Sequence, residues 1–355
     1  MNLVEGPNIN FYKDKKIMVT GHTGFIGSWL SKVLSMNGAE ICGYSLDPPT
    51  SPNLYEILKH NTSILDIRGD VRDRKKLFEI VSDFKPELVF HLAAQPIVLE
   101  SYNNPVETFE TNVTGTVNLL DILRKEGTVK VIVVLTSDKV YRNNERRYPY
   151  RETDYLGGKD PYSASKSCQD MATNSFRETY FKEIGVQVAS IRAGNVIGGG
   201  DWGKHRLVPD IVRGITEEDV IKIRNPESTR PWQHIMDVIS GILKLTSKLW
   251  KDPNFSGPWN FGPLSCQDIK VRDIVEMVIR GWGKGNYEIE KTDNSQEAET
   301  LFLDSSKAIN LLEWAPKYDI QTSIRKTVEW YKEFYNNKDA DIFTERQIQE
   351  YWEGE

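Results

Sequence analysis

Residues 16–30, KIMVTGHTGFIGSWL, place a glycine-rich turn between an apolar run and a helical pattern. The glycines of this turn, Gly21, Gly24 and Gly27, are spaced three residues apart. Such a turn lets the backbone approach a pyrophosphate, and the following helix offers free N–H groups and the positive end of its dipole. Glycines also close many strand–helix turns for structural reasons alone, and that alternative stays open here. The segment predicts a strand–turn–helix unit with the chemistry of a dinucleotide site.

The same order of strand and helix repeats through the first half of the chain. Apolar runs without polar alternation are typical of strands that helices cover on both faces. The segments are 40–46, 88–94 and 130–137 for strands, and 24–38, 73–84 and 105–127 for helices. Gly127 is expected to end the last of these helices. We therefore predict an α/β fold with a Rossmann-type, doubly wound parallel sheet.

The pattern changes after Arg192. Residues 193–210 form a glycine-rich segment that is too long for a simple connection. The remainder mixes helical patterns, such as residues 269–283, with short strands, and it contains no internal repeat. Because no flexible linker is visible, we predict a smaller mixed α/β domain that packs tightly on the first.

The composition argues against several classes of protein. A net charge of −6 argues against a general nucleic-acid binder, which usually has a basic surface. Three cysteines without a CxxC pair predict neither a disulfide framework nor a zinc site, so no metal is expected. No apolar stretch approaches ~18 residues, and the N-terminus has no apolar signal region. We expect a cytoplasmic, enzyme-sized protein without a membrane span.

Two aspartates are candidates for the adenosine end of a dinucleotide site. Asp47 lies twenty residues after Gly27 at the end of the second predicted strand, where a carboxylate can accept hydrogen bonds from a ribose. Its segment, SLDPPT, has no Arg or Lys to bind a 2′-phosphate, which favours NAD over NADP. Asp70 ends the third predicted strand and is expected to face the adenine. Each aspartate is also a common turn or cap residue, and that alternative stays open.

A tyrosine followed four residues later by a lysine occurs at four places, so the spacing alone is a weak signal. The pairs begin at Tyr12, Tyr55, Tyr162 and Tyr287. Only Tyr162 follows a complete nucleotide-binding half and begins a helix, on which Lys166 shares its face. The Lys166 ammonium, with a cationic nicotinamide also close, is expected to lower the pKa of Tyr162 from ~10 towards neutrality, which makes it a usable base. The other pairs are expected to be solvated helix faces.

Ser137, Asp138 and Lys139 directly follow the apolar run 130–135. The carboxyl ends of strands are where doubly wound sheets bind ligands. The sequence therefore predicts a second group of polar residues in the same site as Tyr162. A simple turn at the end of a strand is the alternative.

Several segments resemble the extended short-chain dehydrogenase/reductase family, and within it the CDP-D-glucose 4,6-dehydratases. They are TGHTGFIGSWL, HLAAQPIV, TSDKVY, GGKDPYSASK, RAGNVIGGGDW, RPWQH and WNFGP, and the resemblance extends from about residue 11 to residue 350. The glycine motif and the Tyr–Lys pair are common to the epimerases and dehydratases of the family. The segments TSDKVY, GGKDPYSASK, RAGNVIGGGDW and RPWQH are typical of a much smaller part of it. The resemblance implies NAD as cofactor, a nucleotide sugar such as CDP-D-glucose as substrate, and a place in deoxysugar and lipopolysaccharide biosynthesis.

By position in these motifs, the resemblance implies three sets of site residues. The catalytic residues would be Ser137, Asp138, Lys139, Tyr162 and Lys166. The residues that bind NAD would be Gly21, Thr23, Gly24, Phe25, Ile26, Gly27, Asp47, Asp70, Val71, Leu92, Ala93, Ala94, Gln95, Tyr162 and Lys166. The residues that bind the substrate would be Asn195, Trp202, Arg206, Arg230 and His234. The NAD-binding domain would comprise residues 1–193 with 237–263, and the nucleotide-sugar-binding domain residues 194–236 and 264–355.

The resemblance also implies a reaction. Tyr162 and Lys166 would serve oxidation at C4 of the sugar, with Ser137 bonded near O4. Asp138 would protonate O6, and Lys139 would remove the C5 proton, where the dTDP-glucose and GDP-mannose dehydratases have an acidic residue. A role for Lys139 in orienting Asp138 or the sugar is the alternative. Another nucleotide-sugar 4,6-dehydratase, a 4-epimerase and a non-catalytic nucleotide sensor are the other functions considered, and a homodimer or dimer of dimers is expected.

Overall fold

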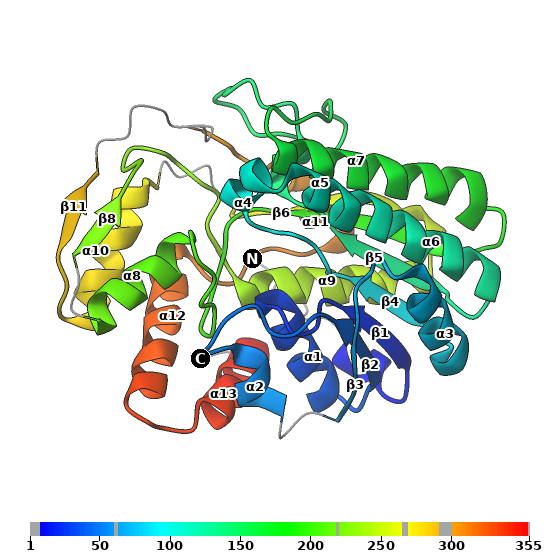
Figure 1. Cartoon of the computed structure of the whole chain (residues 1–355), viewed down its shortest axis with the longest axis horizontal. Helices are drawn as coiled ribbons and strands as arrows, with labels where there is room; N and C mark the ends of the chain where they lie inside the picture. Colours follow the sequence, from blue (N-terminus) through cyan, green and yellow to red (C-terminus); the bar gives the residue numbers. More distant parts are fainter. Residues whose placement is uncertain (1–7, 60–62, 218–219, 265–268, 291–299, 354–355) are drawn as a thin grey trace.

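Seven parallel strands form the central sheet of the computed structural model, which describes residues 8–59, 63–217, 220–264, 269–290 and 300–353 (Figure 1). Their order is β10-β6-β5-β4-β1-β2-β3. The bounds are Lys16–Thr20 for β1, Glu40–Ser45 for β2, Ile64–Arg68 for β3, Leu88–His91 for β4, Val131–Leu135 for β5, Gln187–Ala193 for β6 and Gly257–Phe261 for β10. The strand order reverses between β1 and β4, which is where open α/β sheets bind their ligands.

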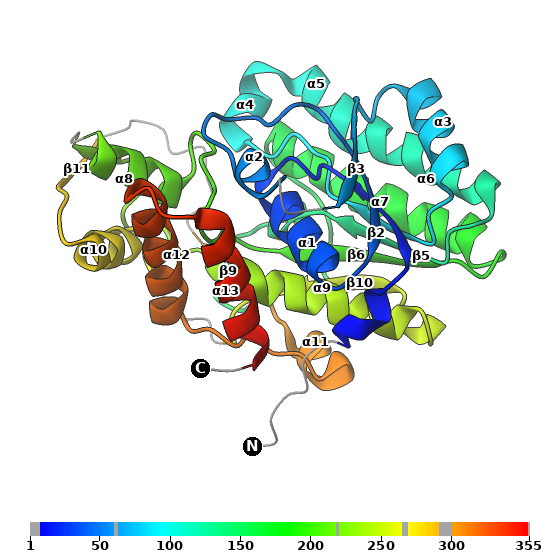
Figure 2. The ribbon, with the colours of Figure 1, turned by 90° about the horizontal axis from the view of Figure 1, so that it is seen from below.

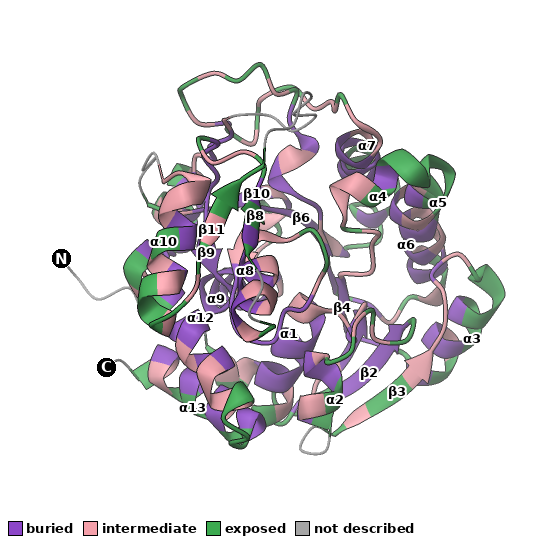
Figure 3. Ribbon diagram, turned by 60° about the vertical axis from the view of Figure 1, so that its left-hand side comes forward, coloured by how far each residue is buried: buried purple, intermediate pink, exposed green. Residues whose placement is uncertain are grey.

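Helices cover both faces of this sheet, as the unbroken apolar runs predict. Ile17 and Val19 of β1 pack into one apolar core with α1 and α9, whereas Met18 packs into a second core with α3 and α6. Figure 1 shows these helices on opposite sides of the sheet, and Figure 3 shows buried residues on the helix faces turned toward it. The bounds are Phe25–Met36 for α1, Arg74–Phe84 for α3, Gly115–Glu126 for α6, Pro161–Phe176 for α7 and Ile235–Leu249 for α9.

The helix ends follow from local side chains. The carboxylate of Asp73 accepts a hydrogen bond from the Lys76 N–H at the start of α3, and Gly127 ends α6 in the left-handed conformation with φ 71°. The predicted helix over 105–127 is continuous in the structure, where α5 (Pro105–Phe109) joins α6 through a π-helical turn at Glu110–Thr114.

A smaller layer of helices and short strands covers the end of the sheet (Figures 1 and 2). The strands form two parallel pairs, β7 (Val196–Ile197) with β9 (Gln233–His234), and β8 (Ile221–Ile223) with β11 (Tyr287–Ile289). The helices of this layer are α8 (Leu207–Thr216), α10 (Val271–Trp282), α12 (Ile320–Tyr335) and α13 (Ala340–Glu353). The other elements are η1 (Ile9–Tyr12), α2 (Leu54–Leu58), α4 (Val98–Asn103), η4 (Asp138–Val140), η5 (Arg177–Phe181), η6 (Pro253–Phe255) and α11 (Ser306–Leu312).

The two layers share one apolar core. The indole of Trp29 on α1 donates to the Gly199 carbonyl oxygen at 3.0 Å. A side chain at Gly199 would approach the Trp330 ring to 2.0 Å, so glycine is required where the long loop passes beneath α12. The tight packing predicted between the two parts is therefore present.

The predicted sheet, the predicted strands of the first half and the helix near 269–283 are confirmed. The sequence left β6 and β10 unassigned, because their apolar runs are interrupted by Arg192 and by Pro258 and Asn260. The domain boundaries stay a prediction. Lys291, the partner predicted for Tyr287, lies outside the described residues. Among the described helices, none combines the length and apolar character that crossing a bilayer requires.

Candidate active site

A cavity of about 980 Å³ runs along the carboxyl ends of the strands, from the glycine turn to the loops of the smaller layer. Nearly all predicted site residues line it. They are Gly21, Thr23, Gly24, Phe25, Ile26, Gly27, Asp47, Asp70, Val71, Leu92, Ala93, Ala94, Gln95, Ser137, Asp138, Lys139, Tyr162, Lys166, Asn195, Trp202, Arg206 and Arg230. The exception is His234. The fold thus brings together residues that are more than 200 positions apart in the sequence.

The three glycines of the turn lack a side chain for different structural reasons. Gly21 has φ 76°, and a Cβ there would lie 2.7 Å from the Ala93 nitrogen, while a Cβ on Gly27 would lie 2.1 Å from the Gly21 carbonyl oxygen. Protein packing therefore requires both. A Cβ on Gly24 would meet only that same oxygen, at an ordinary 3.4 Å. Gly24 begins α1 and faces the cavity, so its missing side chain leaves room for a ligand such as a pyrophosphate at the helix N-terminus. The turn therefore fits a dinucleotide.

Asp47 lines the cavity and has a neighbour that the sequence analysis did not anticipate. Asp47 is highly exposed at the end of β2, and the Arg68 Nε of β3 lies 3.7 Å from its carboxylate. Arg68 also donates to the Leu46 carbonyl oxygen (3.1 Å) and to Asp66 (2.9 Å). SLDPPT itself has no basic residue, but strand pairing brings one beside Asp47. Asp70 forms a forked ion pair with Arg72, which holds the pKa of its carboxyl below the usual range against the effect of burial.

Gln95 is fixed in place beside the cavity. Its backbone N–H donates to the Asn112 side chain (2.8 Å), its amide donates to Thr108 (2.8 Å), and its amide oxygen accepts from the Ile97 N–H (2.5 Å). The polar atoms of the Gln95 side chain are therefore bonded to protein groups, although Gln95 lines the cavity together with Leu92, Ala93 and Ala94.

Tyr162 and Lys166 lie on the first turns of α7. Asp160 caps the helix by accepting from the Ser163 N–H at 2.9 Å, and the Tyr162 N–H donates to the Ser101 hydroxyl at 3.1 Å. Burial raises the pKa of the Tyr162 phenol to about 12, an effect that Ser137 and Arg206 oppose. Burial lowers the pKa of Lys166 to about 7. In the protein by itself desolvation outweighs these effects, so the predicted lowering of the Tyr162 pKa, which also relied on a cationic nicotinamide, stays a prediction for the complex.

Ser137, Asp138 and Lys139 form a tight turn directly after β5. The Ser137 hydroxyl donates to one Asp138 carboxylate oxygen (3.0 Å) and accepts from the Lys139 N–H (3.1 Å). The other Asp138 oxygen is buried and has no hydrogen-bond partner among the described residues. Burial raises the pKa of Asp138, while Lys139, Ser137 and Arg230 oppose the rise. The surroundings thus favour the protonated acid, as a proton donor requires.

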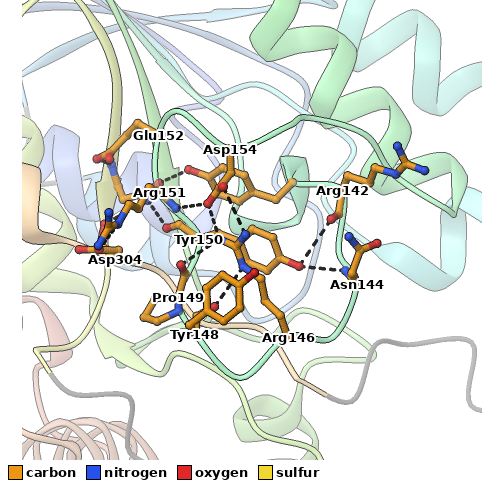
Figure 4. A network of polar contacts seen from close by, with 12 residues as sticks. Arg142, Asn144, Arg146, Tyr148, Pro149, Tyr150, Arg151, Glu152, Asp154 and Asp304 are labelled. Atoms are coloured by element: carbon orange, nitrogen blue, oxygen red, sulfur yellow. Dashed lines mark hydrogen bonds and ion pairs between the residues drawn. The ribbon is translucent and has the colours of Figure 1, made fainter.

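One buried ion pair supports both groups of predicted catalytic residues. Asp170 on α7 binds Arg192 on β6 at 2.7 and 2.9 Å, and it also accepts from Thr136, which precedes Ser137. Arg192 donates to the Tyr141 hydroxyl (2.9 Å), which follows the turn. Figure 4 shows the loop beyond Tyr141, where polar contacts such as those of Arg146 with Asp154 and of Arg151 with Asp304 hold residues 142–154 in place.

The predicted substrate residues differ in their surroundings. Arg230 is buried and close enough to Asp138 to affect its pKa. Arg206 donates to Asp201 at 2.9 Å. Trp202 packs edge-on against Trp330, so most of its surface belongs to the core. His234 caps α9 by accepting from the Met236 N–H at 3.2 Å, and burial lowers its pKa to about 3. The site proposed below therefore omits His234.

The comparisons with known proteins agree with this geometry. The family model described as GDP-mannose 4,6 dehydratase matches residues 18–327. CDP-glucose 4,6-dehydratase of Salmonella typhimurium is 43% identical over 349 residues, covering 96% of this chain and 97% of that protein. The chain belongs to the GDP-mannose 4,6-dehydratase family. The resemblance to extended short-chain dehydrogenases/reductases is thereby confirmed.

Solved structures agree with the fold of this dehydratase family. UDP-glucose 4-epimerase of Thermotoga maritima, solved with UDP-glucose, has a TM-score of 0.77 at 26% identity, covering 90% of this chain and 99% of that one. dTDP-glucose 4,6-dehydratase of Bacillus anthracis, solved with NAD, has a TM-score of 0.75 at 23% identity, covering 91% and 98%. The second likeness shows the fold alone.

The cavity of this family member also has basic residues that the sequence analysis missed. Lys204, His205, Lys222 and Arg224 line the end of the cavity opposite the glycine turn. Lys222 and Arg224 are exposed and lie on one face of the β8 strand and its end, because alternate residues of a strand share a face. The sequence signal for these residues was the alternation of apolar and basic side chains in IKIR, residues 221–224. Among the described residues, no cluster of His, Cys, Asp and Glu is placed to hold a metal ion.

Proposed function

We propose that this protein catalyses the NAD-dependent 4,6-dehydration of CDP-D-glucose to CDP-4-keto-6-deoxy-D-glucose and water. The observation that carries the proposal is the meeting of two chemical groups in one cavity: Tyr162 with Lys166 on α7, and Ser137, Asp138 and Lys139 after β5. The 43% identity to the Salmonella CDP-glucose 4,6-dehydratase over nearly the whole chain supports CDP-D-glucose as the substrate.

Bound along the glycine turn, NAD would supply the hydride acceptor and donor that oxidation at C4 of the sugar and reduction at C6 require. Gly21, Gly24 and Gly27 would hold its pyrophosphate, and Asp47 its adenosine ribose. Tyr162 would accept the proton of the 4-hydroxyl, with Ser137 bonded beside it. Because burial raises the pKa of Tyr162 in the protein alone, the phenolate needs positive charge near it in the complex.

The groups after β5 carry out the elimination. Once C4 is a ketone, the C5 proton is acidic, and Lys139 would remove it. Asp138 would give its proton to the departing O6, so that water leaves and a C5–C6 double bond forms. The proton on Lys139 then returns to C5. The proton that Tyr162 accepted from the 4-hydroxyl is transferred to Asp138, which restores both groups. An epimerase needs no acid at O6, so a buried carboxyl group with a raised pKa at Asp138 favours dehydration over epimerisation.

The charge of the far end of the cavity supports a nucleoside diphosphate as the rest of the substrate. Lys222 and Arg224 line this region, Arg206 and Arg230 line the cavity nearer the predicted catalytic residues, and guanidinium groups suit phosphate oxygens. The sites remain proposals residue by residue, as do the cytoplasmic location and the absence of nucleic-acid binding.

Mass spectrometry tests the proposal. Purified protein with NAD is incubated separately with CDP-D-glucose, dTDP-D-glucose, GDP-D-mannose and UDP-D-glucose. We expect the loss of one water to be fastest from CDP-D-glucose. Faster loss from another nucleotide sugar would assign a different 4,6-dehydratase, an isomer of unchanged mass would assign a 4-epimerase, and no turnover despite bound NAD would favour a sensor.

We also propose a homo-oligomer with a dimer at its centre. Apolar side chains on α4, α5 and α7 are exposed in the single chain, including Val106 (69%), Met171 (48%) and Phe109 (37%). Such a surface is typical of an interface between subunits. Sedimentation at micromolar protein is expected to give a dimer or a dimer of dimers, and a species of only 40.7 kDa would contradict this.

A further inference from the structure

Lys166 is held by a side chain outside the predicted motif. Its Nζ donates to the Gln169 amide oxygen at 2.9 Å and lies 3.5 Å from the Leu135 carbonyl oxygen. Gln169 follows Lys166 by three residues on α7, so both side chains lie on the same face of the helix. Both are buried, with exposures of 2% and 0%.

Gln169 is the end of a hydrogen-bonded chain beneath the cavity. Its amide nitrogen donates to the Thr116 hydroxyl of α6 at 2.9 Å. Thr116 contacts His91 Nε2 of β4 at 2.8 Å, and His91 Nδ1 contacts the Thr20 hydroxyl of β1 at 2.7 Å. Burial lowers the pKa of His91 to about 3, so the imidazole is neutral and carries one proton.

The donor and the acceptor of each hydrogen bond in this chain can be assigned from the contacts at its two ends. Thr20 accepts from the N–H groups of Leu92 (3.2 Å) and Ala93 (3.3 Å), so its own proton points to His91 Nδ1. His91 therefore carries its proton on Nε2 and donates to Thr116.

At the other end of the chain, the hydroxyl proton of Thr116 is given to the Asn112 carbonyl oxygen at 2.7 Å. The Thr116 oxygen must then accept from Gln169. The amide nitrogen of Gln169 consequently faces Thr116, and its oxygen faces Lys166.

We propose that Gln169 is a positioning residue for Lys166, because its amide oxygen fixes the amine in place through an uncharged acceptor. This proposal rests on the role of Lys166 in the proposed function. A glutamate of the same length would accept the same bond but would pair with the ammonium and keep it charged. An apolar side chain would leave the amine without this acceptor and disfavour its charged form.

The other titratable groups near Lys166 do not supply a negative charge that would pair with its ammonium. His91 on β4 is neutral, and Asp170 on α7 is paired with Arg192 on β6. Burial raises the pKa of Asp138 after β5 and of Tyr162 on α7, which favours their neutral forms. Within the described part of the chain, the hydrogen bonds of Lys166 go to an amide oxygen and a backbone carbonyl. Burial lowers the pKa of Lys166, and the acceptor at position 169 is the side-chain contact through which a substitution can change its charge.

NMR of the full protein with ¹³Cε-labelled lysine tests this without turnover. The Lys166 signal is assigned by its loss in Lys166→Arg, and its pKa is read from its chemical shift against pH. In the wild type we expect a pKa of about 7. Gln169→Glu should raise it by about 1 to 3 pH units, and Gln169→Met should lower it. The pH profile of dehydration should move in the same directions.

Gln347→Glu is the matched control, because Gln347 is also buried on a helix, where its amide donates to the Lys326 carbonyl oxygen. It should leave the Lys166 signal unchanged. An unchanged Lys166 pKa in both Gln169 variants, or shifts in the same direction, would overturn the proposal. If Gln169→Glu does not fold, Gln169→Met alone decides. A wild type that titrates as expected but dehydrates no nucleotide sugar would instead contradict the proposed function.

Discussion

Asp138 is a carboxyl group buried in the turn after β5. Burial raises its pKa, and one of its oxygens has no partner among the described residues. Asp138→Asn keeps the shape and the bond from Ser137 but cannot give a proton to O6. We expect NAD binding to be retained and dehydration to fall roughly 10²–10⁴-fold. Near-normal turnover of Asp138→Asn would remove Asp138 from the mechanism.

Lys139 is half-buried beside Asp138 and lines the cavity. If it removes the C5 proton, Lys139→Met should still allow oxidation at C4 and then stall. Absorbance of enzyme-bound NADH should accumulate without loss of water, and exchange of the C5 hydrogen with deuterium from the solvent should disappear. Exchange at the wild-type rate would mean that another group is the base and that Lys139 only orients its neighbours.

Gly24 and Gly27 provide a matched pair for the cofactor site. A Cβ on Gly24 would make an ordinary 3.4 Å contact, whereas a Cβ on Gly27 would lie 2.1 Å from a carbonyl oxygen. Gly24→Ala should keep the melting temperature of the protein without cofactor but weaken NAD binding by about tenfold or more, because the methyl group occupies the approach to the helix N-terminus. Gly27→Ala should lower the melting temperature itself. Equal NAD affinity in Gly24→Ala and wild type would place the pyrophosphate elsewhere.

Single residues were predictable where chemistry follows local spacing. Tyr162 and Lys166 share one helix face, and Asp138 follows a strand, so the sequence alone indicated their meeting at the sheet edge. Arg68 beside Asp47 depends on the pairing of β2 with β3, which puts Ser45 opposite Arg68. His234 was assigned by resemblance, but its side chain caps a helix. Contacts that depend on register or side-chain direction were beyond the sequence.

Helix α7 joins the two catalytic groups through residues spaced by one turn. Asp170 lies one turn beyond Lys166 and ties α7 to Arg192 and to Thr136 before the Ser137 turn. Both partners of the ion pair have side chains that are only 3% exposed. The pair therefore sets the distance between Tyr162 and Lys166 on α7 and the turn formed by Ser137, Asp138 and Lys139.

Asp170→Ala tests the energy of this link. The change leaves the Arg192 guanidinium buried without its carboxylate, so the free energy of unfolding should fall by about 3–5 kcal/mol. Glu329→Ala is the control, because its ion pair with Arg325 is exposed, and it should change the value by less than about 0.5 kcal/mol. Both values come from urea unfolding. A small effect of Asp170→Ala would mean that the pair does not hold α7 to the turn.

The elements of the sheet were predictable in proportion to how apolar they are. β1, β4 and β5 are nearly continuous apolar runs, and the structure confirms them. β6 contains Arg192 because that strand supplies half of the buried ion pair, and the charge hid the strand from a pattern based on apolar residues. The short strands β7 and β9 have two residues each and are strands because they pair with each other.

At the scale of the whole molecule, Asp237 links the central sheet layer to the C-terminal helix. It lies on α9, and its Oδ1 accepts from the Tyr351 hydroxyl of α13 at 2.7 Å and from the Lys317 N–H at 2.7 Å. Burial raises its pKa from 3.8 to about 6. The folded protein therefore binds this proton more tightly than the unfolded chain, and the stability that it contributes at low pH is lost as the pH rises through about 6.

Asp237→Asn keeps the accepting oxygen and removes the buried charge. The wild type should lose about 1 to 2 kcal/mol of unfolding free energy between pH 5 and pH 8 through this group, and the variant should not. At pH 8 the variant should equal or exceed the wild type in stability. The comparison uses urea unfolding at both pH values, and an unchanged pH dependence in Asp237→Asn would show that Asp237 is not the responsible group.

The transfer of hydrogen within one sugar tests the central claim most directly. CDP-D-glucose carrying deuterium at C4 is incubated with the protein and NAD in ordinary water, and the product is analysed by NMR and mass spectrometry. We predict a 4-keto sugar that has lost one water and carries the deuterium in its C6 methyl group. Deuterium that remains at C4, in a product without loss of water, would contradict dehydration and assign the site to epimerisation.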